Sequence, residues 1–176
     1  MIQQDNRLIY KGSFFTLTHE RATLPNGYVH EMEIIHHPGA CAILAVDDAE
    51  RLCLIRQWRH AAGGWLWEVP AGKLEAGEPP LLAAQRELAE EAGIEAAHWQ
   101  SLGSLLPSPG FCDERIHLFL AKGLVAVPTA REPAEVMEVH QLSWPQVQAM
   151  ANGDITDAKT LSILLRYALS QKISLS

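Results

Sequence analysis

The sequence has few cysteines, no excess of basic residues and no long apolar run, and each shortage excludes a class of protein. Its three cysteines, Cys41, Cys53 and Cys112, are an odd number without metal-like spacing, so we expect reduced thiols in a cytoplasmic protein. Fourteen basic against 21 acidic residues give a net charge of −7, and no Lys/Arg cluster suggests a nucleic-acid partner. The longest uncharged apolar run, residues 40–46, is far too short to cross a membrane.

The composition is that of an ordinary globular domain. Apolar residues make up 48% of the 176 residues and charged residues 20%, which excludes a disordered chain. Residues 1–7 lack a basic segment followed by an apolar core, so no signal peptide is expected. We expect one main domain over residues 39–176, preceded by an N-terminal β extension over residues 1–38.

The first third of the chain has the pattern of β-strands. Alternation over residues 13–22, a turn centred on Asn26-Gly27 and a second β-prone stretch over residues 28–37 predict a hairpin or meander. Residues 40–46 predict a buried strand and residues 51–58 another.

Helical periodicity first appears over residues 81–92, with Pro79 and Pro80 suited to the first turn and Gly93 to the end. Further on, the pattern predicts strands at 99–106, 116–124 and 136–142. A helix is expected from the capping box Ser143–Gln146 to Asn152-Gly153. A last helix is capped by Asp157 and has Leu161, Leu164, Leu165 and Ala168 on one face. This order predicts an α/β/α or α+β sandwich around a mixed sheet.

Three glutamates lie on one face of the first predicted helix. Glu87, Glu90 and Glu91 fall within an arc of roughly 100°. Their mutual repulsion costs on the order of 0.7–3 kcal/mol per pair, which a hard cation such as Mg²⁺ or Mn²⁺ would relieve. Arg86 can offset part of the charge or orient a carboxylate. A glutamate-rich helix face taken alone is more often simply solvated, so the flanking residues decide.

A tight loop over residues 69–78, with two glycines and a proline, leads into this helix and can offer a backbone carbonyl to a cation. From Gly72 to Ile94 the chain then resembles the Nudix box, Gly-x5-Glu-x7-Arg-Glu-U-x-Glu-Glu-x-Gly-U, where U is a bulky aliphatic residue, without a departure. The resemblance implies a Mg²⁺-dependent pyrophosphohydrolase of nucleoside diphosphates linked to another group, built as an α/β/α sandwich. The metal ligands that it implies are Glu87, Glu90, Glu91 and the Ala71 carbonyl, with Arg86 and Glu78 holding the loop on the helix.

A second segment is similar to the ADP-ribose pyrophosphatase branch of that family. Residues 107–114 place a proline about fifteen residues beyond the box, within Ser-Pro-Gly and followed by a glutamate. Residues 154–160 also resemble the branch's C-terminal segment. The substrate-binding residues implied by the branch are Ser108, Gly110, Glu114 and Arg59. The implied reaction converts ADP-ribose to AMP and ribose 5-phosphate.

Other readings of the sequence stay open. GDP-mannose, NADH or a nucleoside triphosphate could be the substrate, and a non-catalytic nucleotide-sensing module is the alternative of another class. Trp65 and Trp67 could pack in the core or stack on an adenine.

The catalytic base is the least defined part of the predicted site. The branch usually has an acidic cluster before its last strand, and residues 131–139 are poorer in acids than that pattern. Glu135 or Glu132 is the candidate, whereas Glu138 is expected inside the strand. Glu90 is the catalytic candidate among the box glutamates.

The N-terminal hairpin, with Phe14, Phe15 and Tyr28, holds more apolar surface than a peripheral hairpin needs. The branch forms dimers that exchange this region, so the resemblance implies a homodimer.

Overall fold

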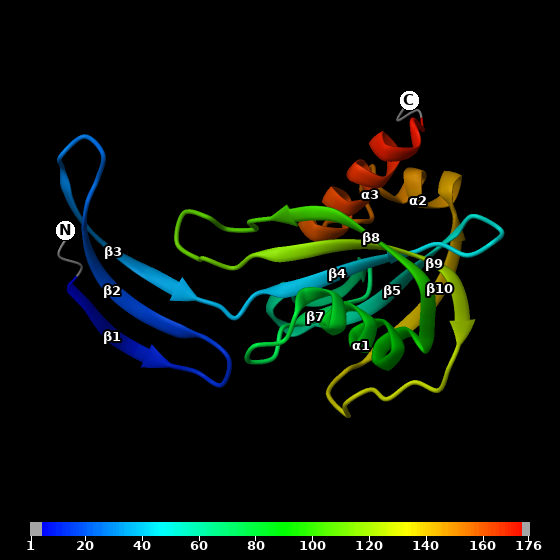
Figure 1. Cartoon of the computed structure of the whole chain (residues 1–176), viewed down its shortest axis with the longest axis horizontal. Helices are drawn as coiled ribbons and strands as arrows, with labels where there is room; N and C mark the ends of the chain where they lie inside the picture. Colours follow the sequence, from blue (N-terminus) through cyan, green and yellow to red (C-terminus); the bar gives the residue numbers. More distant parts are fainter. Residues whose placement is uncertain (1–4, 174–176) are drawn as a thin grey trace.

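The computed structural model describes residues 5–173 and consists of a projecting N-terminal arm and a layered body (Figure 1). In chain order the elements are β1 (Asp5–Lys11), β2 (Thr16–Thr23), β3 (Val29–His36), β4 (Ala40–Ala45), β5 (Arg51–Arg59), the 3-10 helix η1 (His60–Ala62), β6 (Gly64–Glu68), β7 (Ala71–Lys73), α1 (Pro80–Ala92), β8 (Ile94–Leu105), β9 (Ile116–Ala126), β10 (Met137–Ser143), α2 (Trp144–Met150) and α3 (Ala158–Gln171).

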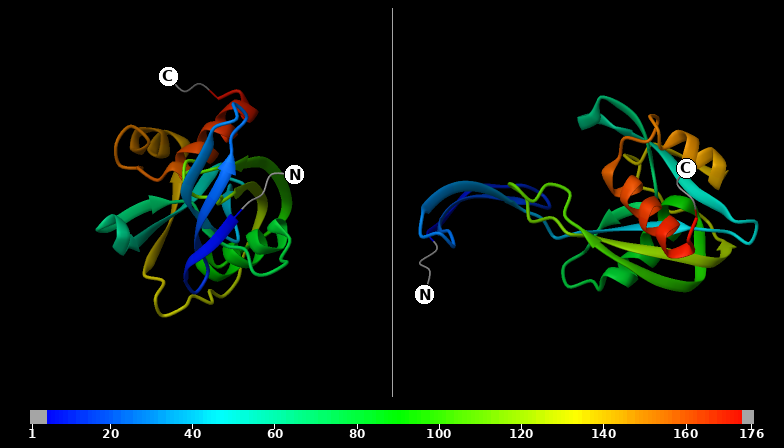
Figure 2. Two further views of the ribbon diagram at one scale, coloured as in Figure 1. Left: turned by 90° about the vertical axis from the view of Figure 1, so that its left-hand side faces the viewer. Right: turned by 90° about the horizontal axis from the view of Figure 1, so that it is seen from above.

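The arm is a three-stranded antiparallel sheet in the order β1-β2-β3, which extends away from the body (Figure 1 and Figure 2, right). The predicted meander is confirmed, but the sequence analysis missed β1. Its apolar residues Leu8, Ile9 and Tyr10 are consecutive rather than alternating, and all three are exposed. The backbone ladder with β2, and not burial of one face, holds this strand in the described chain, so no periodic signal marks it.

At its inner end the arm is hydrogen-bonded to the loop between β8 and β9. The Ile35 N–H donates to the Phe111 carbonyl at 2.8 Å, and the Asp113 N–H donates to the Ile35 carbonyl at 3.1 Å. His36 lies beside the carboxylates of Asp113 and Glu20, with ring nitrogens 2.6 Å and 2.9 Å from their oxygens. The arm and the loop that precedes β9 are therefore one connected unit.

We expect this junction to lose stability as the pH rises. The hydrogen bond with Asp113 raises the pKa of His36 above 6.5, although burial opposes it. Because the folded pKa exceeds the unfolded one, the stabilisation is fully present below about pH 6.5 and is lost as the pH rises through the folded pKa. His36→Gln should therefore lower the free energy of unfolding more in acid than in alkaline buffer, as measured by urea denaturation. The exposed His30→Gln on the same strand is the control, and an equal loss at both pH values would contradict the expectation.

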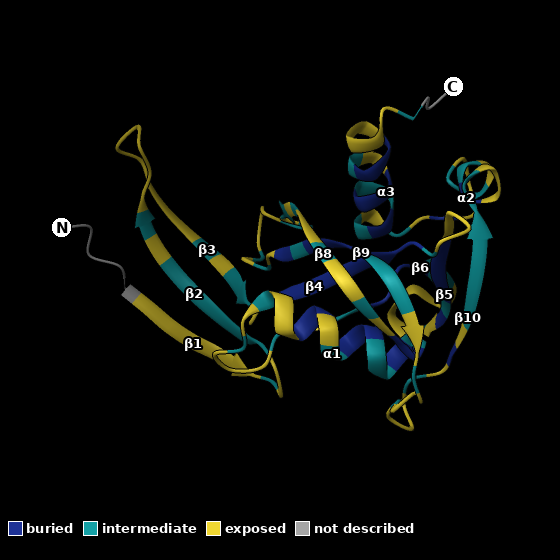
Figure 3. Ribbon diagram, turned by 45° about the vertical axis from the view of Figure 1, so that its right-hand side comes forward, coloured by how far each residue is buried: buried dark blue, intermediate teal, exposed yellow. Residues whose placement is uncertain are grey.

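In the body, two sheets lie between helices. One is mixed, in the order β7-β4-β9-β8 with β4 and β9 parallel, and the other is antiparallel, in the order β10-β5-β6. The wholly buried β4 sends Ala42 and Leu44 into a core shared with α2 and α3, and Cys41 and Ile43 into a core shared with α1 (Figure 3). The predicted α/β/α sandwich is confirmed. The strands form two sheets rather than one because β4 and β5 meet only at the isolated Val46–Leu52 bridge.

Several predicted boundaries were wrong. β8 begins at Ile94 rather than residue 99, because its first residues pair with β9 without showing an apolar alternation. The loop after residue 69 contains the short strand β7, and α2 ends at Met150. Leu165, expected on the buried face of the last helix, is 47% exposed; α3 instead buries Ile163, Leu164, Tyr167 and Ala168.

The predicted helix ends are confirmed where their signals were local. α1 starts at Pro80 and stops at Gly93, which adopts a left-handed conformation with φ of 67°. Asp157 caps α3 by accepting a hydrogen bond from the Thr160 N–H at 2.9 Å. No helix in residues 5–173 combines the length and apolar character that crossing a membrane requires.

Candidate active site

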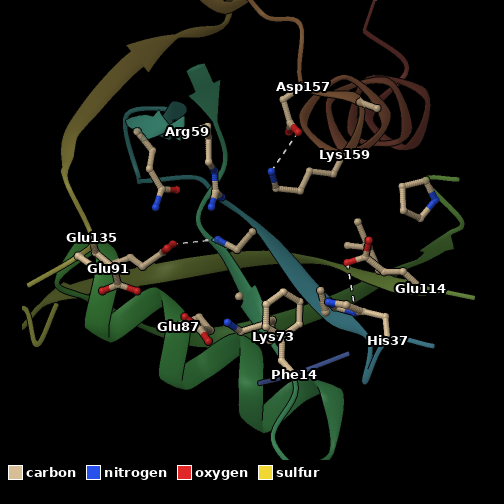
Figure 4. A pocket seen from close by; sticks show the side chains of 18 of the residues that line it. Phe14, His37, Arg59, Lys73, Glu87, Glu91, Glu114, Glu135, Asp157 and Lys159 are labelled. Atoms are coloured by element: carbon tan, nitrogen blue, oxygen red, sulfur yellow. Dashed lines mark hydrogen bonds and ion pairs between the residues drawn. The ribbon is translucent and has the colours of Figure 1, made fainter. Parts of the chain in front are cut away.

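A cavity of about 660 Å³ lies between α1, the start of α3, the end of β5 and the loop before β10 (Figure 4). It gathers seven of the predicted site residues: Arg59, Ala71, Glu87, Glu91, Glu114, Glu132 and Glu135. Three others, Glu90, Ser108 and Gly110, do not line it. The cavity therefore joins the two ends of the predicted site, the box helix and the loop acids, across segments that are far apart in sequence.

The glutamates of α1 differ in how far they are buried. Glu87 and Glu91 are one helical turn apart and are 8% and 2% exposed, since their face packs against β7 and β4. Glu90 has 38% of its side chain exposed and lies in an adjoining hollow of about 380 Å³, which is also lined by Glu87, Glu132 and Glu135. Glu87 therefore connects the two hollows, with Glu91 in the main cavity on one side of it and Glu90 at the rim on the other.

Arg86 ties the preceding loop to the helix. Its Nε and Nη2 donate to the two oxygens of Glu78 at 3.0 and 2.9 Å, and Nη2 also donates to the Lys73 carbonyl. Its Nη1 donates to Glu87 at 2.8 Å and to Glu90 at 3.1 Å. The hydrogen bond with Arg86 lowers the pKa of Glu78. The hydrogen bonds with Glu78 and Glu87 raise the pKa of the Arg86 guanidinium. The expected structural role of this pair agrees with these contacts.

Gly72 makes room for the carboxylate of Glu87. A Cβ at this position would lie 1.9–2.3 Å from the three atoms of that carboxylate, and the backbone angles of Gly72 are ordinary. The glycine of the box is therefore required for space rather than for an unusual backbone conformation.

We expect Gly72→Ala to abolish the hydrolysis that the resemblance to the Nudix box implies, without unfolding the protein. The added methyl group would displace the end of a flexible side chain, not backbone, so the midpoint of thermal unfolding should change little while turnover falls. Gly64→Ala is the matched control, because a Cβ there has no described atom within 4 Å. Wild-type turnover in Gly72→Ala would show that the position of the Glu87 carboxylate is unimportant.

Glu91 is a buried carboxyl group beside other acids. Its Oε2 accepts a hydrogen bond from the Ala71 N–H at 2.9 Å. Burial raises its pKa to about 8, and the charges of Glu87 and Glu135 add to the increase. This environment favours the neutral carboxyl, and a nearby cation would instead favour the ionised form.

The predicted ligands have the chemistry that a divalent metal prefers, although their side chains do not form a compact group in this structure. No three His, Cys, Asp or Glu side chains within residues 5–173 are grouped closely enough to hold an ion. Glu87 and Glu90 accept hydrogen bonds from Arg86, whereas Glu91 accepts one from the Ala71 N–H. The predicted ligands that line the cavity, Glu87, Glu91 and the Ala71 carbonyl, nevertheless offer only oxygen, which hard cations such as Mg²⁺ and Mn²⁺ prefer.

The wall opposite α1 is cationic and contains residues that the sequence analysis did not single out. Arg59 makes a two-pronged ion pair with Glu68, at 2.7 and 2.8 Å, and Lys159 from α3 bonds to the same carboxylate. Lys159 also lies 3.0 Å from Asp157. Burial would raise the pKa of Glu68, but the two cations outweigh it and lower that pKa. The resemblance of residues 154–160 to the branch was the only sequence signal for Lys159.

The arm contributes to the third side of the cavity. Phe14 lines it, with the Lys73 ammonium 4.5 Å from the centre of its ring. His37 packs edge-on against Phe14 and lies 3.5 Å from Glu114 (Figure 4). The predicted substrate residue Glu114 therefore lines the cavity, and Ser108 does not. The Ser108 carbonyl instead closes a turn, where it accepts hydrogen bonds from the Phe111 and Cys112 N–H groups. Gly110 lies within that exposed turn.

Both candidate bases are on the loop before β10. Glu132 is exposed and Glu135 is half-buried, and the Glu135 carboxylate accepts the Glu132 N–H at 2.8 Å. Arg131 anchors the loop by donating to the Glu91 carbonyl at 2.7 Å. Glu138 lies within β10, as expected, and is outside the cavity.

The tryptophans divide between core and surface. Trp67 packs against the core and meets His140 edge-on. Trp65 is 39% exposed and forms an edge-to-face pair with Trp58, which lines the cavity.

Comparison with known proteins identifies the family to which this chain belongs. The NUDIX domain model matches residues 35–162, so the chain belongs to this family of hydrolases. The ADP-ribose pyrophosphatase of Mycobacterium tuberculosis is 44% identical over 89% of this chain and 78% of its own length. That of Bacillus subtilis is 38% identical over 86% and 84%. A crystal structure described as an ADP compounds hydrolase shares the fold, with a TM-score of 0.80 and 20% identity over 99% and 96% of the two chains. The resemblance to the ADP-ribose pyrophosphatase branch is confirmed.

Proposed function

We propose that the protein hydrolyses the pyrophosphate bond of ADP-ribose to AMP and ribose 5-phosphate. One observation supports this most directly: a single cavity is lined by the box carboxylates Glu87 and Glu91 and by the substrate candidates Arg59 and Glu114. The names of the two bacterial relatives point to the same substrate.

Glu87, Glu91 and the Ala71 carbonyl would hold Mg²⁺, or Mn²⁺, with Glu90 as a further ligand from the rim. When bound, the cation neutralises the diphosphate and lowers the pKa of water. Arg59 binds the diphosphate on the opposite wall, and Glu114 binds the substrate from the loop before β9. Glu135 accepts the proton of the attacking water at a carboxylate oxygen, with Glu132 as the alternative.

The reaction is tested with a substrate panel in Mg²⁺ and, separately, in Mn²⁺. ADP-ribose should yield AMP and ribose 5-phosphate with a higher kcat/KM than GDP-mannose, NADH or a nucleoside triphosphate. Preference for one of those compounds would reassign the substrate within the family. Binding of a nucleotide without any product would favour a sensing module.

We further propose that residues 1–38 form a dimerisation region and that the protein works as a homodimer in the cytoplasm. The apolar side chains exposed on the arm, among them Leu8, Tyr10 and Tyr28, support the first point, as does the edge strand β1, which pairs only with β2 among the described residues. Three cysteines without a disulfide partner in the described chain support a reducing compartment.

Light scattering at micromolar concentration should therefore give the mass of two chains. Tyr10→Ser combined with Tyr28→Ser should shift the protein toward the monomer, because both side chains are more than half exposed on the arm. The control pair is Val125→Ser with Leu169→Ser, which are exposed on the body. A monomeric mass of the wild type would overturn the assembly.

A further inference from the structure

The cationic wall of the cavity is organised around one buried carboxylate. Glu68, at the end of β6, is 1% exposed, and both of its oxygens are bonded to cations from different parts of the chain. Arg59 comes from the end of β5 and Lys159 from the first turn of α3. A carboxylate buried so deeply needs such partners, so the two cations are held in fixed positions.

The start of α3 is itself fastened to the strand that carries Glu68. The Val69 N–H donates to the Thr160 hydroxyl at 2.9 Å, and that hydroxyl donates to Asp157 at 2.6 Å. Asp157 also lies 3.0 Å from the Lys159 ammonium. Lys159 therefore extends from a rigid helix start, and only 13% of its side chain is exposed.

Neither cation uses all of its donors on these partners. Arg59 bonds to Glu68 through Nε and Nη2, and its Nη1 makes no hydrogen bond within residues 5–173. Lys159 carries three N–H groups and has two acceptors, Glu68 and Asp157. Both residues line the cavity, so their remaining donors are available to a ligand (Figure 4).

The charges on the two walls indicate which side of the cavity receives the diphosphate. A diphosphate is anionic and is repelled by Glu87, Glu91 and Glu135 on the α1 side. Three basic side chains line the cavity in the described chain, Arg59, Lys73 and Lys159. Lys73 is placed over the Phe14 ring, which leaves Arg59 and Lys159 side by side on Glu68.

We propose that Lys159 binds a non-bridging phosphate oxygen of the substrate together with Arg59, and that Glu68 is the positioning residue that aims both cations into the cavity. This inference rests on the proposed function and adds to it the residues that recognise the diphosphate from the side opposite the box. A ligand with two phosphates would engage both cations, whereas a monophosphate would satisfy one.

The test compares binding of α,β-methylene ADP-ribose, whose phosphorus linkage resists hydrolysis, with binding of AMP, by calorimetry in Mg²⁺. Lys159→Gln should raise the dissociation constant of the methylene analogue by about ten- to a hundredfold, the range for a hydrogen bond to a charged group, and that of AMP by less. Lys159→Arg should restore most of the affinity. Lys122→Gln, which removes a surface lysine paired with Glu50, should leave both constants unchanged.

Folding is not at risk in Lys159→Gln, because Glu68 retains Arg59 and can accept a hydrogen bond from the new amide. Glu68→Gln is the second variant. It should weaken the analogue at least as much as Lys159→Gln does, and part of its effect should vanish in a Lys159→Gln background, since Glu68 acts partly through Lys159. In steady-state assays KM for ADP-ribose should rise more than kcat falls.

An unchanged dissociation constant in Lys159→Gln, or an equal loss of affinity for the analogue and for AMP, would overturn the inference. The proposed function would still stand if the wild type hydrolyses ADP-ribose. Analogue binding that depends on Lys159 in a protein that does not hydrolyse ADP-ribose would support the phosphate site and overturn the proposed function. A wild type that does not bind the analogue would overturn both.

Discussion

Glu91→Gln should reduce turnover by orders of magnitude and leave the fold as stable as the wild type, or slightly more stable. Glutamine keeps an oxygen that can accept the Ala71 N–H, so the bond to the β7 backbone is retained. It removes a buried carboxyl whose pKa is raised to about 8 by burial and by neighbouring acids, which is an unfavourable site for a charge in the metal-free protein. The same substitution removes a charged ligand from the proposed cation site, where carboxylate oxygens are preferred.

The measurements are kcat with saturating ADP-ribose and Mg²⁺, and the midpoint of thermal unfolding in EDTA. Glu95→Gln is the control for loss of a charge, since Glu95 is exposed on β8 just after the same helix. Near-wild-type turnover in Glu91→Gln would show that Glu91 is not a metal ligand. A large drop in the unfolding midpoint would instead assign it a structural role.

The second large effect is expected at the catalytic base. Glu135→Gln should lower kcat by about 10²–10⁴-fold, the usual contribution of a general base, with little change in KM. Glu135 lines the cavity, its carboxylate is held by the Glu132 N–H, and it lies two residues before β10, so its position is better defined than that of Glu132. Box carboxylates occupied with a cation are poor proton acceptors, which leaves the loop to provide the base.

Glu132→Gln should be milder, because Glu132 is exposed and its side chain makes no hydrogen bond within the described chain. Glu138→Gln is the control; its carboxylate is in β10, outside the cavity. If Glu132→Gln is the more damaging variant, Glu132 is the base. If both loop variants keep normal kcat, a box glutamate takes the proton, and Glu90 is then the first to test.

Short-range spacing predicted the site residues of the box, whereas Arg59, Glu114, Glu132 and Glu135 were predicted from the resemblance to the branch. Gly72, Glu78, Arg86 and the box glutamates lie within 23 consecutive positions, and one loop and one helix bring them together. The helix ends at Pro80 and Gly93 were predicted for the same reason, since capping and turn residues act on their immediate neighbours. The presence of β1 could not be predicted, because its stability comes from pairing with β2 and not from its own pattern.

By itself the sequence determined the class of enzyme and the order of most strands and helices, and it predicted which carboxylates would hold a cation, because these depend on patterns of residues close along the chain. Only the tertiary structure decided which of these groups share a cavity. Packing of α1 on β4 and β7 turns Glu87 and Glu91 inward and leaves Glu90 at the rim. The cationic wall joins Glu68 to Lys159, which is 91 positions further along the chain. Such a pairing has no local signal, because burial of one carboxylate selects its partners by proximity in space and not in sequence.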